Sequence, residues 1–164
     1  MEDQMKRILV VEDDRDILIS IKEGLEYHGY EVIGSAVSGE QALSMLERKT
    51  PDLILMDIEL MGEMDGVDTA AIILSKFKIP VVYLTGFTGD KILDRAKLTD
   101  PYGYIVKPFE LSELKIAIEI ALDKHKKQMK KEKTISMLQD SVAEIMFDHP
   151  SNKNPKQMKG GWIS

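Results

Sequence analysis

The stretch Leu53-Ile54-Leu55-Met56-Asp57 places four apolar residues directly before a carboxylate. It follows the turn-forming residues Thr50-Pro51-Asp52, and a short apolar run of this kind is typical of a strand that is buried on both faces of a parallel sheet. Asp57 then lies at the carboxyl end of that strand. Because open α/β sheets bind their ligands along this edge, Asp57 is the first candidate for a functional residue.

Three further strand-like runs also end in polar or charged residues. They cover residues 7–11, 81–84 and 103–106, and they lead into Glu12-Asp13-Asp14, Thr85-Gly86 and Lys107-Pro108. A more polar, alternating run over 31–37 predicts a strand at the sheet edge. Strand and helix alternate five times, which predicts a parallel sheet between two layers of helices with right-handed crossovers. An acidic cluster, a hydroxyl and an ammonium group would then converge on Asp57.

The composition is that of an ordinary globular domain with some additional chain. Of the 164 residues, 43% are hydrophobic and 30% are charged, which is typical of a folded domain. The chain has no cysteine, which excludes disulfides and thiolate metal sites and agrees with the cytoplasmic location that we expect. No apolar run is long enough to span a bilayer or to form the core of a signal peptide, so we expect no membrane association.

Charge is distributed unevenly along the chain. The net charge is −6, but residues 1–123 carry 13 basic and 24 acidic residues, whereas residues 124–164 carry nine basic and four acidic ones. An acidic body repels phosphates, which argues against nucleic-acid binding by this part of the chain. The lysine-rich tail is open to two interpretations, contact with an anionic surface or a solvated helix, and its composition favours the solvated helix.

Glu12, Asp13 and Asp57 would place three carboxylates at one edge of the sheet. Such charges repel one another, so one carboxylate keeps its proton or a divalent cation binds among them. Ligands that are all oxygen, in an open and partly hydrated site, favour Mg²⁺. The alternative is that acids after a strand only cap the next helix, a role that suits Asp14 or Asp16.

Five ordered motifs make the chain similar to a known family. They are Leu9-Val10-Val11-Glu12-Asp13, Leu55-Met56-Asp57, Asp65-Gly66, Leu84-Thr85-Gly86 and Tyr104-Ile105-Val106-Lys107-Pro108-Phe109. In this order and spacing they resemble the receiver domain of two-component response regulators, over residues 6–124. The resemblance implies a flavodoxin-like, doubly wound sheet of five parallel strands in the order 2-1-3-4-5, with helices on both faces. It also implies a signalling switch rather than an enzyme, with a histidine kinase or phosphotransfer protein as the phosphoryl donor.

The same resemblance assigns the acceptor and the metal ligands. Asp57 matches the aspartate that receives the phosphoryl group, and such a domain promotes its own phosphorylation and dephosphorylation. Glu12 and Asp13 match the acidic pair that holds Mg²⁺, with Asp13 as a direct ligand and Glu12 acting through water. In this family the metal also contacts the acceptor and the carbonyl two residues after it, which is the backbone carbonyl of Glu59 here.

The remaining matched positions concern the phosphoryl oxygens and the switch. Thr85 resembles the hydroxyl that bonds one phosphoryl oxygen, and Lys107 resembles the ammonium group that pairs with another. Thr85 and Tyr104 match the two residues that change position on phosphorylation. The bond between Lys107 and Pro108 is expected to be cis, as in the family. We expect the output surface on the fourth helix, the fifth strand and the last helix.

The loop after Asp57 departs from the family pattern, because Met61-Gly62 or Leu60-Met61 stands where Met-Pro is usual and the loop is one residue longer. This departure keeps open a pseudo-receiver, a binding module that never gains phosphate. A haloacid-dehalogenase-type phosphatase is a second alternative, since it also uses a strand-end aspartate, Mg²⁺, Thr and Lys. Its signature needs a second aspartate two residues later, where this chain has Glu59. Glu59 and Phe87 occupy positions that tune hydrolysis in the receiver family.

The last helix, which we expect from about Leu111, has apolar residues on two faces. One face should pack on the sheet, and Ile116 and Ile120 on the other need a second partner, either another molecule or a folded-back tail. Residues 125–148 predict a basic, amphipathic helical extension or linker, whose apolar stripe is too short to predict a coiled coil. A homodimer through the last helix or the tail is one expected arrangement. Residues 149–164 have the composition of a disordered tail.

Overall fold

The computed structural model describes residues 4–86 and 89–148. Strands and helices alternate along this part of the chain, as the sequence predicts. They are β1 Arg7–Val11, α1 Arg15–Tyr27, β2 Glu31–Ala36, α2 Gly39–Leu46, β3 Leu53–Asp57, α3 Gly66–Lys76, β4 Val81–Thr85, α4 Asp90–Lys97, β5 Gly103–Val106 and α5 Leu111–Asp148. Within the described residues no helix is long and apolar enough to cross a membrane.

The strands form one parallel sheet in the order β2-β1-β3-β4-β5. The predicted order is therefore confirmed, and β2 lies at an edge as its polar sequence suggested. Val11 is in register with Met56, and Asp57 is in register with Leu84. The carboxyl ends of β1, β3 and β4 consequently lie side by side, and the loops that leave them meet at one edge of the sheet.

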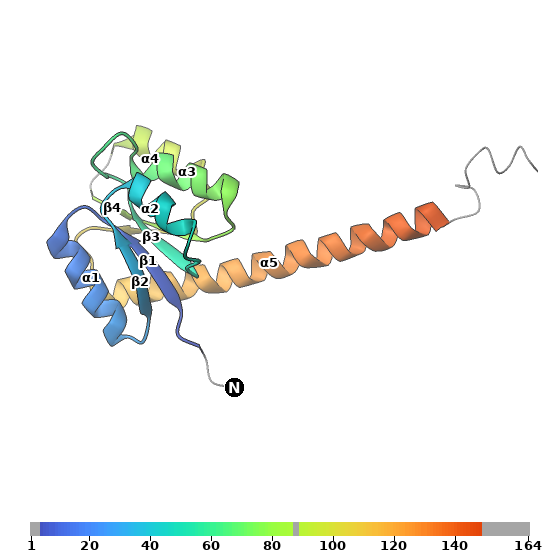
Figure 1. Ribbon diagram of the computed structural model, residues 1–164, viewed down its shortest axis with the longest axis horizontal. Helices are drawn as coiled ribbons and strands as arrows, with labels where there is room; N and C mark the ends of the chain where they lie inside the picture. Colours follow the sequence, from blue (N-terminus) through green and yellow to red (C-terminus); the bar gives the residue numbers. More distant parts are fainter. Residues whose placement is uncertain (1–3, 87–88, 149–164) are drawn as a thin grey trace, which may run out of the picture. The chain divides into compact units, whose positions relative to one another are not determined.

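Two layers of helices cover the sheet (Figure 1). Helices α2, α3 and α4 pack on one face in an apolar cluster that includes Met56 and Tyr83. Helix α1 and the first part of α5 pack on the other face, in a cluster that includes Leu55 and Ile118. All five residues of β3 are buried. This confirms that the run ending in Asp57 is a central strand covered on both sides.

Helix caps set the direction in which the chain leaves the strands. Asp14 is the N-cap of α1, where its carboxylate accepts hydrogen bonds from the backbone N–H groups of Asp16 and Ile17. Because Asp14 takes the capping role, Glu12 and Asp13 are left for the site. Ser38 and Gln41 have the sequence spacing of a capping box, but only half of it forms: the Ser38 hydroxyl accepts from the Gln41 N–H, whereas the Gln41 side chain accepts from the Val37 N–H.

Helix α5 has the two apolar faces that its sequence predicts. Ile118 is fully buried against the sheet, whereas Ile116 is 59% exposed and Ile120 is 47% exposed. The chain divides into two compact units, residues 1–125 and 126–164, and α5 contributes residues to both. The predicted disordered tail, 149–164, and Phe87 lie outside the described residues.

Candidate functional site

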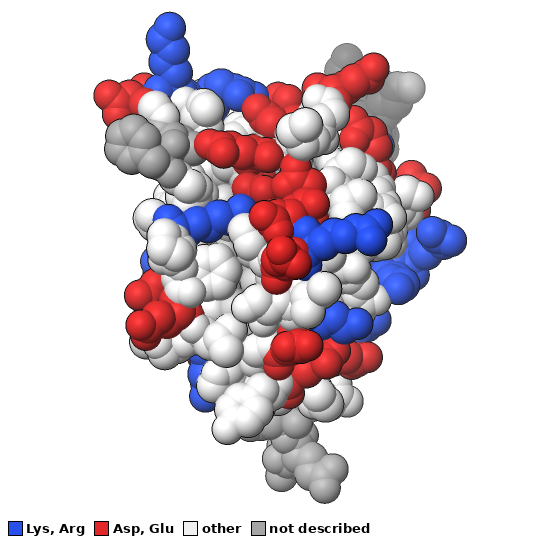
Figure 2. Space-filling model, turned by 90° about the vertical axis from the view of Figure 1, so that its left-hand side faces the viewer, with Lys and Arg blue, Asp and Glu red and all other residues white. Residues whose placement is uncertain are grey.

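Three carboxylates meet at the carboxyl edge of the sheet, as the strand pattern predicts. Glu12 and Asp13 follow β1, Asp57 ends β3, and one oxygen of each lies within 4.8 Å of the others. Glu12 is fully buried and Asp57 is 3% exposed. Figure 2 shows acidic side chains grouped near the centre of one face, with lysine and arginine side chains beside them. Three buried or half-buried carboxylates at this distance require a cation or a shared proton.

Lys107 supplies the nearest positive charge. Its ammonium nitrogen lies 2.6 Å from Glu12 Oε1 and 3.4 Å from Asp57 Oδ1. The Lys107 N–H donates to the carbonyl oxygen of Thr85 at 2.7 Å, which continues the pairing of β5 with β4 beyond the strand end. The Lys107–Pro108 bond is cis, as expected. The predicted convergence of an ammonium group on Asp57 is therefore confirmed in the structure.

The single positive charge of Lys107 does not neutralise three carboxylates, and the excess of negative charge affects Glu12 most clearly. Burial and the neighbouring Asp57 raise the pKa of Glu12 to about 8, although Lys107 opposes this shift. Glu12 Oε2 is buried and accepts no hydrogen bond from the described residues. For Lys107, burial disfavours the charged form, but Glu12 and Asp57 outweigh it and raise the pKa. The oxygen-only set thus contains a buried acceptor without a hydrogen bond from the described residues, and such a set fits a divalent metal ion.

The loop after β3 closes over the acidic cluster through backbone N–H groups. The Glu59 N–H donates to Asp57 Oδ1 at 3.0 Å, and the Met61 N–H donates to Asp13 Oδ2 at 3.1 Å. The Glu59 side chain itself is exposed. Each bond leaves the second oxygen of its carboxylate for another partner, so the loop orients Asp57 and Asp13 without saturating them.

Thr85 ends β4, one residue after the register partner of Asp57. It is 3% exposed, and its hydroxyl donates to the carbonyl oxygen of Gly86 at 3.0 Å. The structure therefore brings the predicted hydroxyl to the same sheet edge. In this structure the Thr85 hydroxyl therefore bonds the loop that follows β4.

Comparison with known proteins decides the family. The model of the response regulator receiver domain matches residues 8–119. The chain belongs to this family. It is 36% identical over 155 residues to the transcriptional regulatory protein PdtaR of Mycobacterium tuberculosis, covering 94% of this chain and 72% of that protein. Receivers act in two-component signalling, so the haloacid dehalogenase and pseudo-receiver alternatives are not favoured.

Solved receiver structures agree with the fold. The signal receiver domain of a modulated diguanylate cyclase from Desulfovibrio desulfuricans is 34% identical, with a TM-score of 0.73 over 76% of this chain and 99% of that one. The N-terminal domain of a response regulator/sensory box/GGDEF three-domain protein from Carboxydothermus hydrogenoformans is 37% identical, with a TM-score of 0.70 over the same shares. The five-stranded receiver fold is therefore shown for the first part of this chain.

The receiver's aromatic residue on β5 lies outward. Tyr104 is 39% exposed, and its ring packs on Tyr83 with 5.8 Å between ring centroids. Tyr83 is fully buried on β4, and its hydroxyl lies 2.6 Å from the Thr99 hydroxyl oxygen after α4. Sequence reasoning assigned no role to Tyr83. Its place as register partner of Tyr104 on the neighbouring strand is the signal that would have identified it.

Gly66 is a second residue whose role sequence reasoning missed, although its motif was recognised. A Cβ at this position would lie 2.8 Å from the Asp57 carbonyl carbon and 2.9 Å from Ile58 Cα. The Gly66 N–H donates to the Ile58 carbonyl at 2.9 Å. Glycine is therefore required for α3 to begin directly against the backbone of the candidate acceptor.

Arg95 was also missed. Its guanidinium group joins α4 to the start of α3, at 2.9 Å from Asp65 Oδ2 and 2.8 Å from Asp68 Oδ1. Burial would raise the pKa of Asp65, but hydrogen bonds from Arg95 and from the Asp68 N–H lower it overall. The receiver thus has a charged link between the start of α3, beside the site, and α4.

Proposed function

We propose that Asp57 accepts a phosphoryl group from the phosphohistidine of a histidine kinase or phosphotransfer protein. The observation that carries this proposal is the meeting of Asp57 with Glu12, Asp13 and the Lys107 ammonium group at one sheet edge. Phosphoryl transfer requires a positioned nucleophile and positive charge around the transferred group. This edge supplies a nucleophile, a cation and a set of metal ligands.

Mg²⁺ is the metal that these ligands suit best. Glu12, Asp13, Asp57 and the backbone carbonyl of Glu59 would hold it, and the acceptor oxygen Glu12 Oε2, which lacks a hydrogen-bond partner among the described residues, supports an added cation here. Hard oxygen ligands in a partly hydrated site favour Mg²⁺ over softer metals. When bound, Mg²⁺ neutralises negative charge on the phosphoryl oxygens.

Residues of the chain itself would carry the transfer. An oxygen of Asp57 bonds to phosphorus as the P–N bond of the phosphohistidine breaks, and the departing imidazole keeps the electron pair of that bond. The acyl phosphate carries about two negative charges where the carboxylate carried one. Lys107, now 3.4 Å from Asp57 Oδ1, pairs with one phosphoryl oxygen. The Thr85 hydroxyl, which now donates to the Gly86 carbonyl oxygen, turns to donate to a second phosphoryl oxygen.

A groove beside the site supports docking of the donor at α1. Its cavity of about 440 Å³ is lined by Asp16, Ile17, Ser20, Lys107, Pro108 and Phe109. It combines apolar residues with the lysine that contacts Asp57, so a histidine presented by a partner protein there would be near the acceptor. We place the donor in this groove.

The output surface in this proposal comprises α4, β5 and the first part of α5, residues 111–125. When Thr85 moves toward the phosphoryl group, it vacates space into which Tyr104 turns, and α4 adjusts. The exposed Ile116 and Ile120 lie on this part of α5, where a target or a second copy would bind. Residues 6–124 thus act as a phosphorylation switch, not as an enzyme for other substrates, and residues 125–148 act as a helical extension or linker.

The experiment that tests the proposal is incubation with acetyl phosphate and Mg²⁺, followed by intact mass measurement. We expect a gain of one phosphoryl mass that is absent with EDTA and absent in Asp57→Asn. The matched control is Asp94→Asn, an exposed carboxylate of α4, which should gain the same mass as the wild type. Stable phosphorylation of Asp57→Asn contradicts the assignment. If the wild type gains no mass, binding of beryllofluoride distinguishes rapid hydrolysis from an inactive site.

A further inference from the structure

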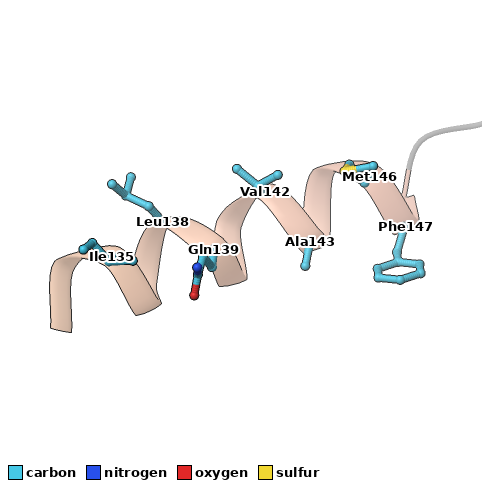
Figure 3. Close-up of a pocket in the computed structure, with 7 residues that line it drawn as sticks. All are labelled: Ile135, Leu138, Gln139, Val142, Ala143, Met146 and Phe147. Atoms are coloured by element: carbon cyan, nitrogen blue, oxygen red, sulfur yellow. The ribbon is translucent and has the colours of Figure 1, made fainter. Parts of the chain in front are cut away.

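The C-terminal part of α5 has an apolar face that the described chain leaves in solvent. We define the apolar face as Ile135, Leu138, Val142, Ile145 and Met146, which are between 53% and 68% exposed. Figure 3 shows Leu138, Val142 and Met146 projecting from the same side of the helix. Neither apolar core of the described residues includes a member of this face. A helix with such a face needs a partner to cover it.

The spacing of the apolar face identifies the kind of partner. Residues 135, 138, 142 and 145 recur at alternating intervals of three and four. This is the 3.5-residue repeat that keeps two helices in contact along a left-handed supercoil. The β-branched Ile135 and Val142 occupy the a positions, with Leu138 at the first d position. The combination of β-branched a positions with Leu138 favours two parallel strands, and Ile145 at the second d position weakens this preference without removing it. A second copy of this helix therefore fits the face.

The residues beside this seam also suit a second copy in parallel. Thr134, Gln139 and Ser141 flank it and carry no charge, so two copies do not repel each other there. One heptad earlier, Lys127 occupies a g position and Glu132 the e position that follows. In a parallel pair a g residue lies beside the next e residue of the other chain. Lys127 of each copy would therefore meet Glu132 of the other.

The contact is small, and its lysines oppose it. At about 100 Å² for each large apolar side chain removed from water, five residues per copy bury about 1,000 Å² in total. Interfaces of this size belong to weak, concentration-dependent complexes. Lys131 occupies the d position one heptad before the seam, so its two copies come close together in a parallel pair, whereas Lys126, Lys130 and Lys133 lie on the outer face of the helix. Salt screens the repulsion between the two copies of Lys131, so the pair should tighten as ionic strength rises.

We propose that residues 135–148 of α5 pair with the same segment of a second copy as a weak, parallel, two-stranded coiled coil. The contact uses neither Asp57 nor the carboxylate cluster. It is therefore independent of the proposed phosphoryl transfer, and the Asp57→Asn variant should dimerise as the wild type does.

Sedimentation equilibrium of the full chain, from about 10 µM to about 1 mM, tests the pairing. We expect a reversible dimer that Leu138→Glu weakens by at least about tenfold, because a carboxylate enters the seam. Met137→Glu is the matched control: Met137 and Leu138 are both 61% exposed, but Met137 lies outside the seam. Circular dichroism verifies that both variants keep their helix content. A wild type that stays monomeric, or equal weakening by both variants, overturns the proposal.

A cross-link tests the orientation. The chain has no cysteine, so an introduced thiol has only its own copy to pair with. Ile135 occupies the a position at the start of the paired segment, where in a parallel pair the two copies lie close enough for a disulfide, whereas in an antiparallel pair they lie at opposite ends. We expect Ile135→Cys to form a covalent dimer in a glutathione redox buffer, and Ser136→Cys, outside the seam, to form far less. Failure of Ile135→Cys to cross-link where the wild type is dimeric overturns the parallel arrangement.

Discussion

Replacement of Gly66 by alanine should damage both stability and phosphoryl transfer, because α3 begins against the backbone of Asp57. The added Cβ would clash first with the Asp57 carbonyl oxygen and would lie 2.8 Å from the carbonyl carbon. Ordinary contact begins at 3.4 Å, so the carbon alone requires the two segments to separate by about 0.6 Å, and the oxygen requires more. The obstacle is backbone, which no side-chain rotation relieves. The hydrogen bond from the Gly66 N–H to Ile58 is strained by the same movement.

We expect Gly66→Ala to lower the free energy of unfolding by about 2–3 kcal/mol, from overpacking together with the weakened hydrogen bond. Displacement of Asp57 by this amount should slow phosphorylation by about tenfold or more. Urea unfolding measures the first effect, and the rate of mass gain with acetyl phosphate and Mg²⁺ measures the second.

Gly86→Ala is the matched control for the same change. Among the described residues beyond its chain neighbours, a Cβ there would meet no atom within 4 Å, and Gly86 does not have a positive φ. The control should be neutral, or more stable by up to about 1 kcal/mol because alanine restricts the unfolded chain. If Gly66→Ala has the same free energy of unfolding and the same rate of phosphorylation as the wild type, the close approach of α3 to Asp57 does not constrain the site.

Two further predictions concern charge. Because the folded-state pKa of Glu12 is raised to about 8, the folded protein holds a proton that the unfolded chain loses above about 4.5. Between pH 5.5 and pH 7.5 the unfolding free energy of the metal-free protein should therefore fall by about 1–3 kcal/mol more in the wild type than in Glu12→Gln. Urea unfolding in EDTA measures this difference. If the two proteins lose stability in parallel over this pH range, the prediction is wrong. Arg95→Gln should cost at most about 1 kcal/mol, because Arg95 and its partners Asp65 and Asp68 are 30–46% exposed, but it should speed amide exchange in α4. High salt should reduce that difference, and a large salt-independent loss would refute the surface character of the link.

Local signals account for most of the fold. The run that ends in Asp57, the polar strand at 31–37 and the helical repeats each lie within a few residues, so the order of residue types is sufficient to predict them. Asp14 as an N-cap is also local, because its carboxylate bonds N–H groups two and three residues later. Gln41 is the exception, because its spacing from Ser38 is that of a capping box but its side chain accepts from the Val37 N–H instead.

Contacts between distant residues account for the rest. Arg95 lies 30 residues from Asp65 along the chain, and no local pattern predicts that α4 would place a guanidinium group beside the start of α3. Gly66 has a recognisable motif, but its requirement follows from the approach of α3 to the backbone of β3. Tyr83 matters because the register of β4 and β5 sets it against Tyr104.

The sequence alone determined the alternation of strand and helix, the sheet edge at which Asp57 lies, and the identity of the acids, hydroxyl and lysine that gather there. Only the tertiary structure decided how deeply Glu12 is buried and that its second oxygen is left without a hydrogen bond from the described residues. It also decided that Lys107 bonds Glu12 more closely than Asp57. The reason is physical: burial and charge separation depend on residues as far as 95 positions apart, which only folding brings within hydrogen-bonding distance.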